Sequence, residues 1–574
     1  MSSTTPFRWN RLPVEIRHLV LEQLHLMSPG RDTLATPLSD FPRWKLIKRS
    51  TVRSQYAAVN REFQHFFEAI NFNNILISQE HLDEFKKIVS GQNRCRLGYI
   101  RRLWLRFILP EYGCDDCQTA ESRETQTTNN ALFTRALIRL LDILSQWKRK
   151  DALKEHRAKG MVLELSAHSP SDVQHHWRHL FPLREDYPYR PLDDHSPYIE
   201  FSREDKEECG SLTDEFHHIE KGDLRLRNVP HGARARLFGR SLLDFNFRNC
   251  PLRRKRRTRT KLPQVELVTG LCFRRQFYRS LRPVVVGRLM KESFPCIQKL
   301  NYEFWYQNVG PEHLHERELP WFLLYRIPAT LKKLTLFRDF NLTLNGQQYW
   351  DNYPAASDLI GGILAIASRN LEVLASSWIT DAKDFLKPYD KEFFALHGHK
   401  TIGGDILSWP NLHSLALTAT DLHPSSSHGR MNRLLLFAAR AAMKMPKLTT
   451  MELWNSGGWK PTTAQACVFR YHCSKKDGPT ITWCSTWPDD YEFVLNKGVI
   501  SAWREVAETH ARRTLTVQHI QLGPKELPIY GPFIKWRTNG ALTGELMLDN
   551  EILENISQFQ IELETLRRPR ATWE

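Results

Sequence analysis

A short apolar frame recurs along this chain and constrains its fold more than any other feature of the sequence. In each copy two apolar residues lie three positions apart, and a third usually follows two positions later; the copies begin at Ile100, Ile297, Leu331, Leu371, Leu412 and Leu448. Such a frame predicts a short buried strand. The last five copies begin 34, 40, 41 and 36 residues apart, which is enough for a helix to return the chain to a parallel neighbouring strand. The sequence therefore predicts an α/β fold.

Helical patterns lie before several of these frames, and a Pro or Asn separates helix from strand. The patterns run over Val286 to Glu292, Asp358 to Ser368 and Arg430 to Met443. Two further strands are predicted at Met161 to Leu165, after an apolar helix from Ala131 to Trp147, and at Val265 to Val268. The unit resembles an irregular leucine-rich repeat, whose usual period is about 20 to 29 residues. This resemblance implies a solenoid; the alternative is a generic α/β domain with buried strands.

The chain has 574 residues, more than one ordinary domain. A long insertion is predicted because Ser166 to Pro251 is rich in His, Asp, Arg, Pro and Tyr and has little periodicity. We divide the chain into a helical domain at 9–70, the first repeat-like units at 97–165, the insertion with a basic loop at 166–262, and a repeat-like region at 263–574. Near its end we predict a helix at Lys497 to Ala511, a strand at Leu515 to Ile520 and a helix at Asp549 to Leu566 that caps the solenoid.

Two apolar stripes at helical spacing open the chain. The first has Pro13 near the first helical position, Glu15 in the first turn, and apolar residues at 12, 16, 19, 20 and 24. After a polar break from Ser28 to Ser50, the second stripe contains Tyr56, Val59, Phe63, Phe66, Phe67 and Ile70. On periodicity alone, the two stripes would pack on each other in a small helical domain.

The residues of these stripes resemble an F-box. The first stretch reads Leu12-Pro13-x-Glu15-Ile16, with Val20-Leu21 and Leu24 behind it. The second, Val59-Asn60-Arg61-Glu62-Phe63, is similar to the later part of that motif. The stretch from Met27 to Arg53 departs from the family, because it is longer and richer in Pro and Arg than a compact F-box. The chain also resembles the uncharacterised F-box proteins of filamentous fungi. An F-box before a large repeat-like domain is the arrangement of a substrate receptor in an SCF-type ubiquitin ligase.

This resemblance implies two kinds of partner. A Skp-family adaptor would bind the helices and join them to a cullin scaffold, and the repeat-like domain would bind an unknown target protein, holding it near the ubiquitin-conjugating enzyme without covalent chemistry of its own. The adaptor-binding residues would be Leu12, Pro13, Ile16, Leu19, Val20, Leu24, Val59 and Phe63. The alternative is a protein-interaction scaffold with no ubiquitin role, in which the N-terminal helices cap the solenoid.

The sequence contains none of the catalytic motifs that we sought, so we do not predict an enzyme. A phosphate loop, a dinucleotide-binding glycine motif and a nucleophile elbow are all absent. Cys114-Asp-Asp-Cys117 has the spacing of half a zinc site, but it lacks a second cysteine pair nearby. We interpret it as a surface turn and predict neither metal nor other cofactor. An α/β enzyme with a scattered site would escape this search.

The chain carries a formal net charge of +17, and much of it lies in one basic run from Arg253 to Lys261. The residues Arg253, Arg254, Lys255, Arg256 and Arg257 are a candidate nuclear signal, and a solvated linker is the equal alternative. The run has no aromatic residue for base stacking, so nucleic acid is not an expected partner. No apolar run approaches the length of a membrane span, and the start lacks a signal-peptide core. We therefore expect an intracellular protein of the cytoplasm, the nucleus or both, with no membrane partner.

Overall fold

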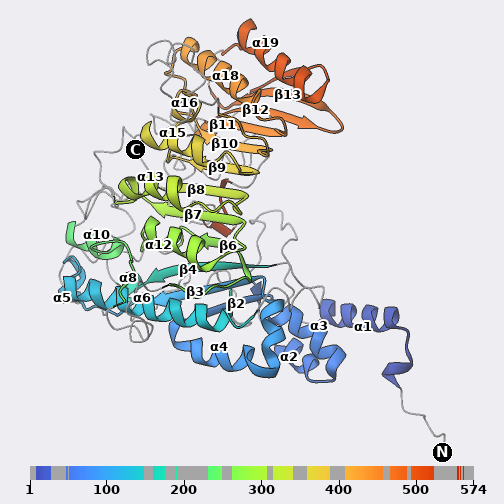
Figure 1. Cartoon of the computed structure of the whole chain (residues 1–574), viewed down its shortest axis with the longest axis vertical. Helices are drawn as coiled ribbons and strands as arrows, with labels where there is room; N and C mark the ends of the chain where they lie inside the picture. The colour runs from blue at the N-terminus through green and yellow to red at the C-terminus, as the bar shows by residue number, and fades with distance from the viewer. Residues whose placement is uncertain are drawn as a thin grey trace, which may run out of the picture.

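One large sheet organises the chain. The computed structural model describes residues 8–27, 47–48, 51–147, 160–174, 189–190, 231–247, 261–306, 314–339, 358–387, 407–456, 466–487, 493–521, 552–554, 556–557 and 560. Within them, 12 strands form a sheet in the order β14-β13-β12-β11-β10-β9-β8-β7-β6-β4-β3-β2, which runs along the molecule in Figure 1. Each strand of this sheet pairs with the strand that precedes or follows it within the sheet along the chain. The chain is therefore mixed α/β, as predicted.

Strands β3, β7, β8, β9, β10 and β11 lie at the predicted apolar frames. The bounds of the strands in the large sheet are β2 (Asn74–Ser78), β3 (Arg102–Ile108), β4 (Met161–His168), β6 (Val268–Phe273), β7 (Lys299–Trp305), β8 (Lys333–Asp339), β9 (Val373–Ser377), β10 (Ser414–Thr418), β11 (Thr450–Ser456), β12 (Ala466–Ser474), β13 (Gly478–Ser485) and β14 (Thr516–Gln521). Pairing is parallel except at β12, which is antiparallel to β11 and β13. A separate two-stranded sheet joins β1 (Ile47–Lys48) to β5 (Tyr189–Arg190).

Helices cover one face of the large sheet (Figure 1). They are α4 (Leu82–Val89), α6 (Arg123–Leu144), α12 (Pro283–Arg288), α13 (Leu314–Arg326), α15 (Asp358–Ala367), α16 (Ala382–Leu386), α18 (His428–Ala442) and α19 (Lys497–Val506). Alternate residues of each strand point to opposite faces. In β3, Leu103 and Leu105 are fully buried in the core that the sheet shares with these helices. Arg102 and Trp104 therefore belong to the opposite face.

Three helices precede the sheet and have a small core of their own. They are α1 (Val14–Met27), α2 (Thr51–Ala57) and α3 (Arg61–Asn71), and Figure 1 shows α1 extending away from the sheet. We predicted one helical stripe from Tyr56 to Ile70, but the stripe is divided between α2 and α3. The reason is Asn60, whose Oδ1 accepts hydrogen bonds from the N–H groups of Glu62 (2.9 Å) and Phe63 (3.0 Å) and so caps a new helix.

The predicted insertion is described only in part. The structure gives α8 (Ser171–Gln174), β5, and α10 (His231–Phe238) with the residues that follow it to 247. The candidate nuclear signal at 253–257 lies outside the described residues, so it stays a prediction. No helix in the described part of the chain has both the length and the hydropathy that a membrane crossing requires.

The end of the chain differs from the prediction. We expected Asp549 to Leu566 to form a helix that caps the solenoid. The described residues 552–554, 556–557 and 560, which we call the C-terminal segment, instead lie against the middle of the sheet on the face opposite the helices, in dark red near β6 and β7 in Figure 1. Ile552 and Leu553 are buried there in an apolar cluster with Phe337 and Trp454. The C-terminal segment thus removes large apolar side chains of the sheet from water, and it does not cover β14, which is exposed along its whole length.

Candidate interaction surfaces

The structure divides the predicted adaptor-binding residues between two sides of the N-terminal helices. Ile16 (44% exposed), Leu19 (53%) and Val59 (61%) are open to solvent. Pro13 is also exposed, Leu12, Val20 and Leu24 are half-buried, and Phe63 is buried. The Phe63 ring packs 5.1 Å from the ring of Trp9, inside the small core. Phe63 therefore supports α1 from within, and the exposed residues are those that a partner can reach.

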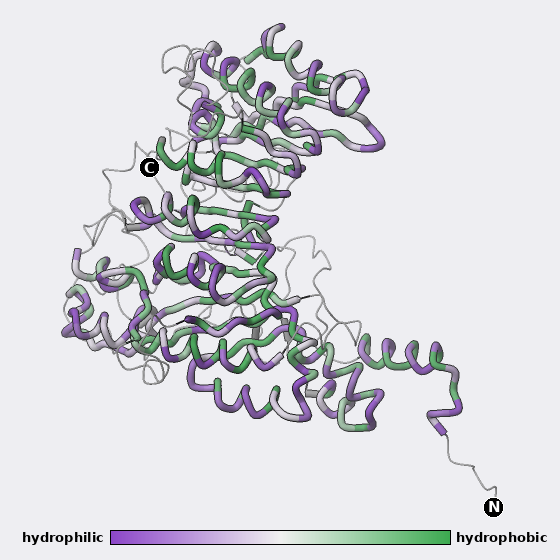
Figure 2. Tube along the Cα trace, in the orientation of Figure 1, coloured by the Kyte–Doolittle hydropathy of each residue, from purple (hydrophilic) through white to green (hydrophobic). Residues whose placement is uncertain are grey.

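Four exposed apolar residues of α1 share one face, whereas Val14 at its start is exposed on another side. Leu26 and Met27, which sequence reasoning missed, are 43% and 77% exposed. They lie on the same side of the helix as Ile16 and Leu19, because positions 16, 19, 26 and 27 fall within about a third of a turn of one another at 3.6 residues per turn. Figure 2 shows hydrophobic and hydrophilic residues alternating along this helix. We call Ile16, Leu19, Leu26 and Met27 the outer apolar patch.

Polar contacts fix α1 on α3 so that the outer apolar patch faces away. The Nε1–H of Trp9 and the Nη1–H of Arg17 both donate to Oε2 of Glu62, at 2.7 and 3.0 Å. On the inner side, Leu21 packs with Phe67 in the small core. The face of α1 that carries the patch is thus directed outward by contacts on its other side.

A second set of contacts joins α3 to the 3-10 helix Gly91–Tyr99, which leads into β3. The Nδ1 atom of His65 lies 2.8 Å from the hydroxyl of Tyr99, and the Arg96 guanidinium donates to the Glu68 carboxylate at 2.5 and 3.0 Å. Burial raises the pKa of Glu68, but the hydrogen bonds from Arg96 and Gln64 outweigh this effect, so the pKa lies below its usual value. The helical cluster is therefore anchored to the sheet through α3, while α1 lies outermost.

The sheet face opposite the helices carries a charged network. The Nε–H of Arg102 donates to Oε2 of Glu164 at 2.7 Å, and the Nε–H of Arg274 donates to Oε1 of the same carboxylate at 2.5 Å. Glu164 is almost completely buried. Nearby on β7, Glu303 accepts a hydrogen bond from the backbone N–H of Arg275 at 3.0 Å. Strands β3, β4 and β7 thus bring charged side chains together on the sheet face that the helices do not cover.

The C-terminal segment binds to this network. Oε1 of Glu554 accepts from Nη1 of Arg102 at 2.6 Å, and its Oε2 accepts from Nδ2 of Asn301 at 2.5 Å. Glu303 accepts the backbone N–H of Glu554 at 2.8 Å and the hydroxyl of Ser557 at 2.6 Å. Sequence reasoning missed this site because its residues are hundreds of positions apart.

The two carboxylates of this site have opposite pKa shifts. Burial raises the pKa of Glu303 to about 7, although its hydrogen bonds from Ser557, Glu554 and Arg275 act against the rise. Burial also raises the pKa of Glu554, but the charges of Arg102 and Lys299 outweigh it, so the pKa of Glu554 lies below its usual value. Glu554 is therefore held as a carboxylate, while Glu303 can take up a proton near neutral pH.

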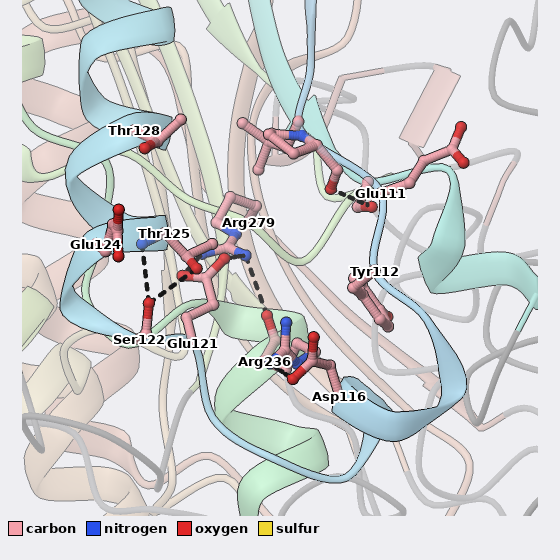
Figure 3. A pocket seen from close by; sticks show the side chains of 13 residues that line it. Glu111, Tyr112, Asp116, Glu121, Ser122, Glu124, Thr125, Thr128, Arg236 and Arg279 are labelled. Atoms are coloured by element: carbon pink, nitrogen blue, oxygen red, sulfur yellow. Dashed lines mark hydrogen bonds and ion pairs between the residues drawn. The ribbon is translucent and has the colours of Figure 1, made fainter.

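A cavity of about 240 Å³ lies beside the N-terminus of α6, beyond the end of β3 (Figure 3). Arg279 donates to both carboxylate oxygens of Glu121, at 2.8 and 2.6 Å, and the Nε–H of Arg236 donates to the backbone oxygen of Thr119 at 2.7 Å. The residues that line the cavity include Tyr112, Ser122 and several acids, but no His, Lys or Cys. Both arginines of the lining lie close to acids, Arg279 at Glu121 and Arg236 at 3.8 Å from Asp116.

The cysteine motif lies next to this cavity on α5 (Cys114–Cys117). Cys117 is buried and Cys114 is half-buried. In the described ranges, no group of three or more His, Cys, Asp and Glu side chains could hold a metal ion.

Comparison with known proteins identifies one similarity. Residues 326–554 match the sequence model of a family of unknown function, DUF6546. The match begins at the end of α13, covers β8 to β14, and ends at Glu554, the residue that binds Arg102. It covers less than half of the chain and excludes the N-terminal helices. Neither the curated proteins nor the solved structures contain a match to the chain.

Proposed function

We propose that this chain is the substrate-recognition subunit of an SCF-type ubiquitin ligase. The observation that carries the proposal is the outer apolar patch on α1, a helix that begins within the F-box-like Leu12-Pro13-x-Glu15-Ile16. Apolar residues that gather on one exposed helix face are typical of a protein-binding surface. A Skp-family adaptor would cover this patch and Val59, and would connect the chain to a cullin scaffold.

The energetics of the patch fit a docking surface. Complete burial of a Leu or Ile side chain contributes about 1.5 to 3 kcal/mol, and Ile16 and Leu19 each still expose about half of their surface. Pro13 starts the helix without losing a needed hydrogen-bond donor. Phe63 and Leu21 hold the inner side of α1, so little rearrangement is needed when a partner binds the outer side.

We propose further that the large sheet is an irregular leucine-rich-repeat-like solenoid that binds the target protein. Consecutive parallel strands with helices on one face support this proposal. The strands β7, β8, β9, β10 and β11 begin at 299, 333, 373, 414 and 450, so each unit is longer than the usual repeat. The antiparallel strand β12 is a departure from such an array. Location in the cytoplasm, the nucleus or both belongs to the same proposal.

The scaffold alternative predicts a different burial of the apolar residues in the N-terminal helices. If they only capped the sheet, their apolar residues would be buried within the chain. The exposure of Ile16, Leu19 and Met27 favours the adaptor-binding function instead.

The test is co-purification of the full chain with a Skp-family adaptor. The Ile16→Ser/Leu19→Ser variant removes the centre of the patch and leaves the inner contacts of α1 intact. The control variant, Trp321→Ser/Tyr325→Ser, removes two aromatic residues from α13 that are even more exposed than Ile16 and Leu19. We expect the wild type and the control to retain the adaptor and the patch variant to lose it. Absence of the adaptor from the folded wild type, or its full retention by the patch variant, would refute the proposal.

A further inference from the structure

We propose that the sheet face under the C-terminal segment is a binding site for an external peptide with two adjacent aliphatic residues followed directly by a carboxylate. In this proposal, Ile552, Leu553 and Glu554 are a built-in competitor that occupies the site until such a peptide displaces it. The inference names the class of target that the proposed receptor would take, and it rests on the proposed function only for the consequence of binding.

The aliphatic part of the ligand would bind an apolar cluster on the sheet. Ile552 and Leu553 are only 1% and 3% exposed. They belong to one apolar cluster whose other members come from five neighbouring strands or strand ends: Phe337, Ala375, Trp378, Ala416, Trp454 and Val468. Trp378 and Trp454 meet edge to face with ring centroids 5.5 Å apart. Large rigid rings beside small Ala side chains leave a shaped apolar surface, which is the usual lining of a specific binding site.

The carboxylate of the ligand would be read by two donors. Arg102 and Asn301 bind the two oxygens of Glu554 from different strands. Arg274 and Lys299 also attract this carboxylate. The site therefore presents three cations, Arg102, Arg274 and Lys299, to an incoming acid. A basic residue at the same position would meet repulsion.

The backbone of the ligand would be fixed by Glu303. Its carboxyl oxygens accept the N–H of Glu554 and the hydroxyl of Ser557, three residues further on. Residues 556 and 557 are helical, and Glu303 binds one backbone N–H just before them, at Glu554, and one side-chain hydroxyl, at Ser557. The site thus recognises apolar side chains, a carboxylate and a backbone conformation together.

The chain's own segment reaches this site from far along the sequence. It follows β14 at one end of the sheet, yet Glu554 binds β3 and β7 nearer the other end. All the contacts described are noncovalent, so a separate peptide with the same residues can make them. A tethered segment competes at an effective concentration of about millimolar. A target peptide must therefore bind tightly enough, or be concentrated enough, to displace it.

The experiment measures the affinity of the full chain for a fluorescent synthetic peptide with the sequence of residues 549–560. The receptor chains are the wild type, Glu554→Lys to undock the segment, and Glu508→Lys, which makes the same charge change at an exposed position. We expect Glu554→Lys to bind the peptide about tenfold more tightly than the wild type and the control. A peptide with the Glu554→Lys change should bind that chain about tenfold more weakly than the unchanged peptide.

Equal affinity of all three folded chains, or of both peptides, would overturn the proposal. If Glu554→Lys does not fold, Glu554→Gln replaces it, because it removes the charge and keeps the shape of the side chain. Unfolding of both variants would show that the segment belongs to the folding core, which would also overturn the proposal. No adaptor is present in this experiment, so its failure leaves the adaptor-binding proposal intact, and the reverse holds as well.

Discussion

The Nη1 atom of Arg102 lies 2.6 Å from the Oε1 atom of Glu554, although 452 residues separate the two along the chain. Arg102 begins β3, near the start of the sheet. Glu554 also binds Asn301 on β7, so its carboxylate bridges β3 and β7, with β4 and β6 between them. The end of the chain therefore stabilises the part of the sheet that the beginning of the chain forms.

The pKa of Glu303 predicts that the chain loses stability as the pH rises towards neutral. The pKa of Glu303 is about 7 in the folded chain, whereas the ordinary value for a Glu side chain is 4.5. The folded state therefore binds the proton more tightly than the unfolded state. The resulting stability is present in full below about pH 4.5 and is lost as the pH rises to about 7. Relative to Glu303→Gln, the wild type should lose about 1 kcal/mol for each pH unit in this window, measured by urea unfolding. Parallel pH profiles would contradict this role.

His315 predicts a loss of stability on the acid side. Burial lowers its pKa from 6.5 to about 3, so the unfolded chain takes up a proton that the folded chain resists. Its contribution is present above about pH 6.5 and falls by about 1 kcal/mol for each pH unit below that value. His315→Phe should flatten this slope, because Phe does not titrate. A Phe ring can also keep the stack on Phe304, where the ring centroids are 4.4 Å apart. An unchanged slope in thermal melts of the variant between pH 4 and 6.5 would contradict the assignment.

The cap at Asn60 predicts a local change in α3. Asn60→Ala removes the acceptor for two backbone N–H groups and should destabilise the start of the helix by about 1 kcal/mol. Hydrogen exchange should then be faster at the first turn of α3, while the sheet is unaffected. Asn60→Asp keeps an acceptor oxygen and serves as the control. Equal exchange in the Ala and Asp variants would show that the cap is unimportant.

Two neighbouring glycines of α15 should respond in opposite directions to alanine. A Cβ atom on Gly361 would lie 2.6 Å from Cβ of Asp384, while one on Gly362 would meet nothing within 4 Å. Gly361→Ala should therefore destabilise the chain by about 1 to 3 kcal/mol through overpacking against α16. Gly362→Ala should stabilise it by about 0.5 to 1 kcal/mol, because Ala favours the helix. Thermal melts of the two variants test this, and shifts of the same sign would contradict the packing.

Much of the sheet could be predicted because its buried face requires apolar residues at fixed spacing. Leu331, Leu334 and Leu336 are all buried at β8, as their frame predicts. The strand β2 escaped prediction because Asn74 to Ser78 is a short apolar run without that frame. The strand predicted from Val265 begins only at Val268.

The candidate surfaces were predictable only where a local motif marks them. Ile16 and Leu19 follow from the F-box-like sequence, whereas Leu26 and Met27 lie beyond its last motif residue and were missed. Their spacing from Leu19 and Ile16, two and three helical turns, was the available signal. The contact of Glu554 with Arg102 has no such signal, because ion pairs between distant positions leave no pattern in a single sequence.

The central claim is that α1 binds a Skp-family adaptor through its outer apolar patch, and isothermal titration of the full chain with the purified adaptor tests it most directly. We predict saturable binding of one adaptor to each chain with a negative heat-capacity change, because Ile16, Leu19 and Met27 lose exposed apolar surface. Ile16→Asp should remove both the binding and the heat-capacity signal. Absence of binding by the folded wild-type chain, or binding that Ile16→Asp leaves unchanged, would contradict the account.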